Sequence, residues 1–390
     1  QMCIRDRHGL VFMSITIRRM IVKKFQTLLW VILSVLFVLG GVRFGRASDL
    51  NEGTNGNSFL YLPLVMRNYP PPPPVFGVEI NRGWVSSTVT KAVEGNFYWV
   101  RYNGIVWHEV EPTEGGGYNW SASLDSELEM LRSEGLEPVV IIRGTPQWAQ
   151  MPWGIGNKQS YCGPIRQDKM TKFGDFVRAV VQKYSQPPYS IKYWEFGNEP
   201  DVDPALVPVD SPFGCWGNEN DEYYGGGYYA EMLKVVYPIV KTVDPSARVV
   251  FGGLLLDCDP TNPPPGKTCK PAKFLEGVLR NGGGNYFDIL AYHAYPSWTS
   301  NTQYYNDYDL NFGSWSHRGG ILRGKLAYLR DILNNYGHGS KPVHMNEGGL
   351  ICWTNDPQWP CNTSVFYQSQ GNFAIRMYTR LFASNVQGIM

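Results

Sequence analysis

The sequence lacks the residue clusters that metal-dependent enzymes need. Its six histidines are scattered along 390 residues, and no two of its seven cysteines have the Cys-x-x-Cys spacing of a zinc site. No cysteine lies at ligand spacing from a histidine either. We therefore expect no zinc site, no metal-dependent hydrolase and no cofactor.

The chain also lacks an excess of positive charge outside its first 47 residues. Residues 1–47 hold eight of the 35 lysines and arginines and one of the 34 acids, which leaves 27 basic and 33 acidic residues in the remainder. A mildly acidic body is the opposite of the basic patches that bind nucleic acid. We expect no nucleic-acid partner, and the oligomeric state stays open.

The N-terminal apolar run is short for a membrane span. Leu28–Gly41 has 14 residues, whereas a span needs about 20. Basic residues precede this run and a small-residue cleavage site follows at Ala47, so residues 1–47 are typical of an export signal. We expect a secreted or extracellular protein; the alternative is an uncleaved anchor at the membrane.

A proline-rich stretch separates this leader from the rest of the chain. Five consecutive prolines, Pro70–Pro74, exclude a helix or a central strand and favour a stiff extended form. We interpret residues 48–74 as a linker and residues 75–390 as a single domain.

Cysteine is scarce, and its positions predict disulfides. Cys3 lies in the leader, which leaves an even number in the domain. In an exported protein these six cysteines are expected to form three disulfides. Two pairs are close in sequence, which leaves a third: Cys258 with Cys269, Cys352 with Cys361, and Cys162 with Cys215.

Short β-rich runs alternate with helical patterns from residue 75 onward. Seven such units with near-continuous apolar strands favour a parallel α/β fold, a (β/α)8 TIM barrel. An eighth strand is expected to start in residues 384–390, so the barrel would be incomplete at the C-terminus, without its last helix. The seven strands predicted are 75–80, 97–102, 137–144, 191–197, 247–253, 287–295 and 341–349.

Two glutamates end two of these strands. Glu199 follows the fourth strand in "YWEFGNEP", and Glu347 ends the seventh in "VHMNEGG". The carboxyl ends of the strands of such a barrel meet on one face, where long loops build the site. Two carboxylates that face each other there suit glycoside hydrolysis, in which one gives a proton and the other attacks.

These motifs resemble the clan A retaining glycoside hydrolases, a cellulase-like and β-xylosidase-like group. The resemblance is carried by the Asn-Glu-Pro and Glu-Gly strand ends within a (β/α)8 pattern, and it spans residues 75–390. It implies that Glu199 is the acid/base, that Glu347 is the nucleophile and that no cofactor is needed. It also implies a carbohydrate substrate, and Asn198 is expected to bind it.

Three further residues match positions that the clan uses near its nucleophile. Arg101 lies on the second strand, and His293 and Tyr295 form a His-x-Tyr motif on the sixth. Arg101 could fork two hydrogen bonds to Glu347 and keep it ionised. The alternative for Arg101 is an interior salt bridge, for example with Glu195.

Other residues have weaker assignments. We expect Tyr295 to donate to Glu347 or to be a core aromatic. Alternation along the seventh strand predicts that Val343 and Met345 share a side with Glu347, and that His344 points to the helices. Tryptophans in loops that follow strands could stack on sugars: Trp107, Trp148, Trp153 and Trp216.

The sequence therefore predicts an exported retaining glycosidase that cleaves β-linked oligo- or polysaccharides. The alternative from another class is a non-catalytic carbohydrate-binding barrel tethered at the cell surface.

Overall fold

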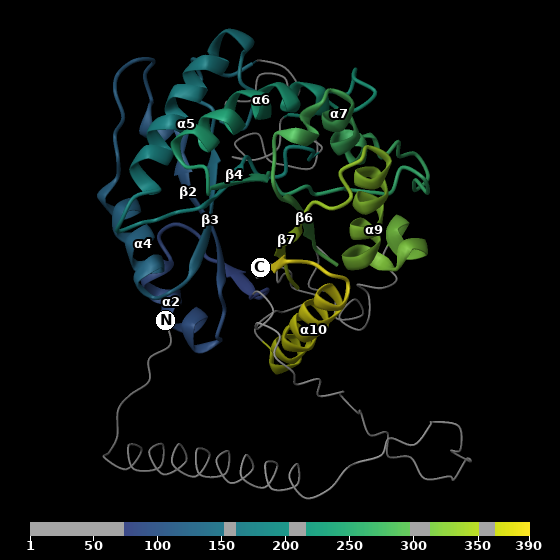
Figure 1. Ribbon diagram of the computed structural model, residues 1–390. Coiled ribbons are helices and arrows are strands. Elements are labelled where there is room, and N and C mark those ends of the chain that lie inside the picture. The colour runs from purple at the N-terminus through teal and green to yellow at the C-terminus, as the bar shows by residue number, and fades with distance from the viewer. Residues whose placement is uncertain (1–73, 152–160, 203–215, 297–312, 351–362) are drawn as a thin grey trace, which may run out of the picture. The chain divides into compact units, whose positions relative to one another are not determined.

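The computed structural model describes residues 74–151, 161–202, 216–296, 313–350 and 363–390. Strands and helices alternate along this part of the chain, and the helices lie outside the strands (Figure 1). No helix among the described residues combines the length and the hydropathy that a bilayer span requires. The predicted leader, and all of the predicted linker except Pro74, lie outside the described residues.

All strand pairs in the described part of the chain are parallel. One sheet holds five strands and another holds three, each in sequence order. Isolated backbone bridges connect the two sheets. Val250 pairs with Ile289, Leu254 with Tyr292, and Phe76 with Ile389. The strands are β1 (Gly77–Glu79), β2 (Trp99–Val106), β3 (Glu137–Arg143), β4 (Tyr193–Phe196), β5 (Arg248–Phe251), β6 (Leu290–Ala294), β7 (Val343–Gly348) and β8 (Gly388–Ile389).

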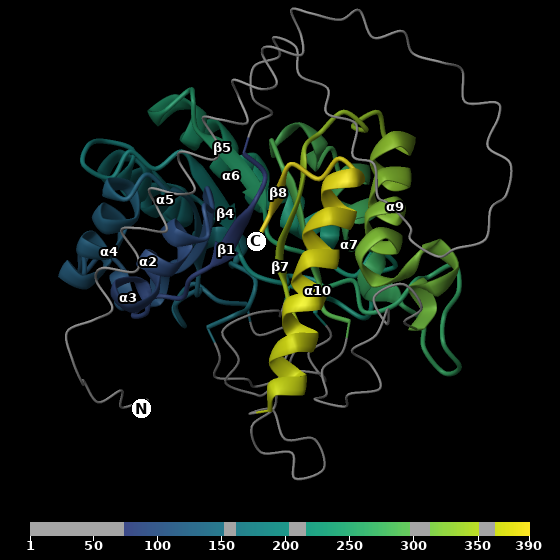
Figure 2. The same cartoon turned by 90° about the horizontal axis from the view of Figure 1, so that it is seen from below.

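The helices carry their apolar residues on the side that faces the strands. In α5 the buried residues recur every three or four positions, from Phe173 through Val177 and Val180 to Tyr184. Figure 2 shows α10 and α9 beside the last strands. The main helices are α2 (Val85–Glu94), α3 (Trp107–Val110), α4 (Ala122–Ser133), α5 (Met170–Tyr184), α6 (Gly226–Val243), α7 (Phe274–Arg280), α9 (Gly320–Asn335) and α10 (Ser364–Ala383).

The predicted order of elements is confirmed. Six of the seven strands predicted in full contain an observed strand; the predicted strand 97–102 overlaps β2, which continues to Val106, and β8 lies within residues 384–390. Continuous apolar strands such as β3 are buried on both faces, which is why their pattern indicated a parallel sheet.

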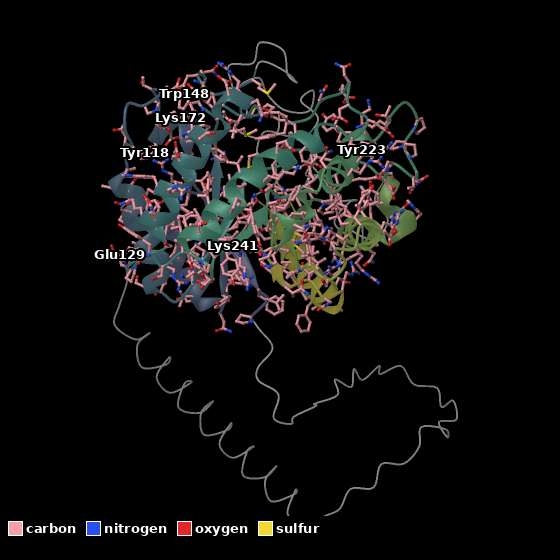
Figure 3. All side chains as sticks on the ribbon, turned by 45° about the horizontal axis from the view of Figure 1, so that its top comes forward. Tyr118, Glu129, Trp148, Lys172, Tyr223 and Lys241 are labelled. Carbon is pink, nitrogen blue, oxygen red and sulfur yellow. A yellow bond between two sulfur atoms is a disulfide. The ribbon has the colours of Figure 1, made fainter. Side chains whose placement is uncertain are left out.

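On the side of the strands that faces away from the helices, called the inner side here, the side chains change from apolar to charged toward the carboxyl ends. Trp99, Val139 and Val250 form part of a small inner core. Arg101 lies two positions after Trp99 on β2, and Glu195 lies two positions after Tyr193 on β4, so both are on this side of the strands. They are buried and form a salt bridge. Side chains fill the space between strands and helices, so the strands are packed on their helix side (Figure 3).

The predicted alternation on β7 is wrong. Val343 and Met345 belong to the core shared with the helices, whereas His344 lies 5.3 Å from the Trp99 ring on the inner side. The pairing with β6 skips one residue, Asn346, before Glu347. This bulge puts Asn346 and Glu347 on the same inner side, because an extra residue in one strand re-aims the side chains that follow.

One predicted disulfide is confirmed. Cys258 and Cys269 are bonded, with their Cα atoms 5.2 Å apart, in the loop after β5. Cys162 is also disulfide-bonded. The other three predicted partners, Cys215, Cys352 and Cys361, lie outside the described residues.

Candidate active site

Glu199 is held at a sharp turn after β4. Gly197 and Glu199 both have positive φ, 80° and 44°, and the Glu199 amide donates to the Gly253 carbonyl at 3.0 Å. A positive φ is uncommon for a glutamate and concentrates at sites that need one fixed side-chain direction. The carboxylate is buried, and its Oε1 lies 2.8 Å from His293 Nδ1.

Glu347 lies near the end of β7 and stays reachable from outside. Its side chain is 18% exposed. Arg101 Nη1 and the Tyr295 hydroxyl both donate to its carboxylate. Burial alone would raise the pKa of Glu347, but the charges of His293 and Arg101 and the bond from Tyr295 lower it to about 2. Glu347 is therefore an anion at neutral pH.

The two glutamates meet at His293. One carboxylate oxygen of Glu199, one of Glu347 and a His293 ring nitrogen all lie within 4.8 Å of one another. His293 Nδ1 is 3.6 Å from Glu347 Oε2. Burial alone would lower the pKa of His293, but the neighbouring carboxylates of Glu347 and Glu199 raise it. Residues that are distant in sequence thus converge at one point, as the strand positions predicted.

Arg101 makes a denser network than the sequence indicated. Its fork binds Glu195, with Nε to Oε2 at 3.1 Å and Nη2 to Oε1 at 2.9 Å, so the predicted fork to Glu347 is wrong. Arg101 donates only one hydrogen bond to Glu347, from Nη1. The same Nη1 lies 3.3 Å from Glu79, and Nη2 donates to Asn198 Oδ1. The salt bridge with Glu195 and the contact with Glu347 therefore coexist, because one guanidinium has five donors.

Glu195 accepts further hydrogen bonds that hold this network in place. Besides Arg101 it accepts from Asn346 Nδ2 at 2.8 Å and from the Gly253 amide at 3.1 Å. A buried carboxylate with four such donors is satisfied, and its partners are locked in position. Glu195 is thus the structural partner that the sequence indicated.

Glu199, His293 and Glu347 could each offer one atom to a metal ion. Both oxygens of Glu347, however, already accept hydrogen bonds from Arg101 and Tyr295. The Arg101 charge beside Glu347 also opposes a second cation there. The donors present therefore fit a hydrogen-bonded acid pair better than a metal centre.

The predictions of sugar-stacking tryptophans have different outcomes. Trp107 is buried against Trp148, Phe173 and Phe176, so its predicted role as a sugar platform is wrong: neither ring face is open. Trp148 is only partly buried and lies near the edge of the molecule in Figure 3. Its stacking role stays a prediction, and Trp153 lies outside the described residues.

A cavity opens over the Glu347 carboxylate. It measures about 270 Å³ and is lined by side chains from β1, β2, β3 and β7 and from the turn after β4. A second cavity of about 460 Å³ shares Glu79, Asn81 and Glu347 with it. Together they match the size of a small-ligand site.

Two residues of this cavity, Glu79 and Arg143, were missed by the sequence reasoning. Glu79 is the register partner of Arg101 on the neighbouring strand, and Arg143 ends β3 just before Gly144. A charged residue at the end of a buried strand was the available signal for both. Burial raises the pKa of Glu79 to about 7, against the opposing effect of Arg101.

The Glu79→Gln variant should be more stable than the wild type at pH 8 and similar at pH 5. The folded-state pKa of Glu79 lies above its unfolded value, so its contribution to stability is full below about pH 4.5 and is lost as the pH rises through 7. The carboxylate is partly exposed, so the gain at pH 8 should not exceed about 2 kcal/mol. Urea unfolding at both pH values measures it. Equal changes at pH 5 and pH 8 would contradict the assignment.

Comparisons with known proteins find similarity in structure but not in sequence. No protein-family model and no curated protein matches the chain. Among solved structures, a family 39 glycoside hydrolase from Bacteroides cellulosilyticus WH2 superposes with a TM-score of 0.56 at 18% identity, covering 81% of this chain and 55% of that one. A glucosidase from Croceicoccus marinus gives 0.52 at 16% identity, with 81% and 59% covered.

A monomeric β-xylosidase from Caulobacter crescentus CB15 gives a TM-score of 0.51 at 17% identity, with 81% of this chain and 59% of that chain covered. The chain thus spans less than two thirds of the length of these three structures. At such identities the likeness concerns the fold. The chain shares with these glycoside hydrolases an α/β architecture of parallel strands and surrounding helices.

Proposed function

We propose that this protein is a retaining glycoside hydrolase that cleaves β-glycosidic bonds, with Glu347 as nucleophile and Glu199 as acid/base. The observation that carries the proposal is the approach of the two carboxylates to within 4.8 Å. Retaining enzymes hold their carboxyl groups about 5–5.5 Å apart, whereas inverting enzymes leave about 6.5–9.5 Å for a water molecule. The short separation supports the retaining mechanism.

We also propose that the eight strands close into the barrel of a (β/α)8 fold. The backbone bridges between the two sheets support this, as does the position of both glutamates after the carboxyl ends of their strands. Active sites of this fold lie on that face. The barrel brings β4 and β7, which are far apart in sequence, to the same mouth.

In the first step Glu347 attacks the anomeric carbon. A carboxylate oxygen forms a covalent bond to that carbon while the glycosidic C–O bond breaks, and Glu199 gives its proton to the departing oxygen. Arg101 and Tyr295 hold Glu347 in place and keep it ionised. Asn198, fixed through its Oδ1 by Arg101, is left with its amide donors for the sugar.

In the second step Glu199, now ionised, takes a proton from water. The hydroxide equivalent attacks the same carbon, the bond to Glu347 breaks, and the sugar leaves with its original configuration. His293 contacts Glu199 directly and lies near Glu347, so it holds the two carboxylates in register during the exchange of charge.

The predicted leader indicates where the protein would act. We propose that the protein is exported and acts outside the cell on β-linked carbohydrate, either free or held at the surface by an uncleaved leader. Of the three compared structures, one is named a glucosidase and another a β-xylosidase, so β-glucosides and β-xylosides are the first neutral substrates to test.

The intact protein should release the β-anomer first from an aryl β-glycoside. Two inversions at the anomeric carbon restore its configuration, and proton NMR of the fresh product distinguishes the anomers before they equilibrate. Release of the α-anomer would rule out double displacement. Sugar binding without any hydrolysis across β-linked substrates would instead indicate a carbohydrate-binding protein.

A further inference from the structure

Arg143 points into the candidate active site. It ends β3, and alternation places its side chain on the same side as Ile141 and Val139. Val139 belongs to the inner core, and Ile141 and Arg143 both line the 270 Å³ cavity. Glu347 and Asn198 line the same cavity, so Arg143 faces the position that a bound sugar would take.

The Arg143 guanidinium has no partner of its own in the described part of the chain. It makes no hydrogen bond and no ion pair there, and its Nε is buried without an acceptor. Burial and the nearby Arg101 charge lower the pKa of Arg143, while the carboxylates of Glu109 and Glu79 act at longer range in the opposite direction. An arginine stays charged nevertheless, so the described part of the site holds a cation without a directly paired anion.

The neighbouring arginines differ in this respect. Arg101 is saturated by Glu195, Glu347 and Glu79. Arg82 pairs with Glu109. A cation that the described residues leave unpaired inside a ligand cavity can bind an anion supplied by the ligand, and a guanidinium matches a carboxylate with two parallel hydrogen bonds.

We propose that Arg143 binds a carboxylate of the sugar, and that the substrates of this enzyme are glycosides of uronic acids. The inference rests on the glycosidase function proposed above and adds the chemical class of the sugar. Glu347 attacks the anomeric carbon, and the sugar carboxylate points toward β3. Glu79 lies on β1, with β2 between it and Arg143, so its charge belongs to the Arg101 side of the cavity.

A different role for Arg143 is that of a general counter-charge. Three carboxylates surround Arg101, so a second cation nearby lowers the repulsion among them whatever the substrate is. In that role Arg143 would affect neutral and acidic substrates equally. In the proposed role it acts selectively on acidic substrates, and this difference defines the experiment.

The experiment compares two 4-nitrophenyl substrates that differ only at C6, the β-D-glucuronide and the β-D-glucoside, with the β-D-xyloside as a second neutral substrate. The intact wild-type protein should hydrolyse the glucuronide with the highest kcat/KM. Hydrolysis of a neutral substrate at least tenfold better than the glucuronide overturns the inference and leaves the glycosidase function standing. No hydrolysis of any aryl glycoside overturns both.

Variants of Arg143 then test the contact itself. Arg143→Gln should reduce kcat/KM for the glucuronide by about 30-fold or more, because a buried charge loses its partner, and should change neutral substrates by less than about threefold. Arg143→Lys keeps the charge but not the fork, and should recover part of the loss. Arg166→Gln, an exposed arginine paired with Asp168, is the matched control.

Thermal unfolding separates this result from misfolding. Arg143→Gln removes a partly buried charge that has no partner among the described residues, so its midpoint should not fall below that of the wild type. An equal loss on the glucuronide and the glucoside with unchanged stability would assign Arg143 the counter-charge role and overturn the proposal.

Discussion

Glu347→Gln should lower kcat/KM by about 10⁴-fold or more on every glycoside that the wild type cleaves. The glutamine keeps the size of the side chain but cannot form the glycosyl bond, and losing a nucleophile removes a covalent route for which the remaining contacts do not compensate. The loss should not depend on the leaving group, because the first step needs attack by Glu347 whatever departs. Initial rates with two aryl leaving groups of different acidity measure it.

The matched control for this variant is Glu129→Gln. Glu129 is an exposed glutamate on α4 at the edge of the molecule (Figure 3), and its change should leave activity at the wild-type level. Circular dichroism and thermal unfolding should show that both variants are folded. If Glu347→Gln kept more than about one hundredth of wild-type activity, Glu347 would not be the nucleophile, and the role of its contacts with Arg101 and Tyr295 would need another explanation.

Glu199→Gln should produce a loss that depends on the leaving group. General acid catalysis contributes about 10²–10⁴-fold, and the contribution is needed most when the departing oxygen is basic. Hydrolysis of a β-linked disaccharide should therefore fall by about 10³-fold or more, while cleavage of a dinitrophenyl glycoside should form the glycosyl-enzyme almost normally. The glutamine carbonyl can still accept from His293, so the local structure is kept.

The informative quantity is the slope of log(kcat/KM) against leaving-group pKa. It should be steep in Glu199→Gln and shallow in the wild type. Slow hydrolysis of the accumulated glycosyl-enzyme should appear as a burst of phenol followed by a low steady rate, because Glu199 also activates water in the second step. A loss of the same size on both kinds of substrate, with no burst, would remove Glu199 from the acid/base role.

Combining the two variants also tests whether the two carboxylates act together. The two carboxylates, with His293 between them, form one cluster of contacts, so the effects of Glu199→Gln and Glu347→Gln should not add. The double variant should be about as slow as Glu347→Gln alone. A double variant that is slower by the product of the two effects would indicate that the two groups act independently.

The sequence alone determined the order of elements and the two glutamates. Apolar strands and amphipathic helices are local patterns, and each carries its own evidence of burial. Glu199 and Glu347 could be identified because each follows a recognisable strand, and the carboxyl ends of parallel strands share one face. His293 and Tyr295 were found through the resemblance of their His-x-Tyr motif to clan A glycoside hydrolases, and their spacing of two predicted that they share one side of the strand.

What depends on the contacts between strands could only be decided by the tertiary structure. The bulge at Asn346 is a property of the β6–β7 pairing, and it puts Glu347 on the same side of β7 as His344, whereas simple alternation assigned these two residues to opposite sides. The partner of the Arg101 fork was likewise decided by the tertiary structure, which brings the Glu195 carboxylate on β4 within hydrogen-bond distance of it.

Trp107, Glu79 and Arg143 show the same limit of sequence reasoning. Trp107 is a loop tryptophan in the sequence, but Phe173 and Phe176 of α5 cover its ring. Glu79 and Arg143 are single charges at strand ends, and only the packed structure shows that Glu79 lies beside Arg101 and that Arg143 has no partner among the residues that the structure describes. The sequence determined which residues lie on which strand, because periodic burial is local. The fold decided which charges meet, because register, bulges and neighbouring helices are set by residues far away in the chain.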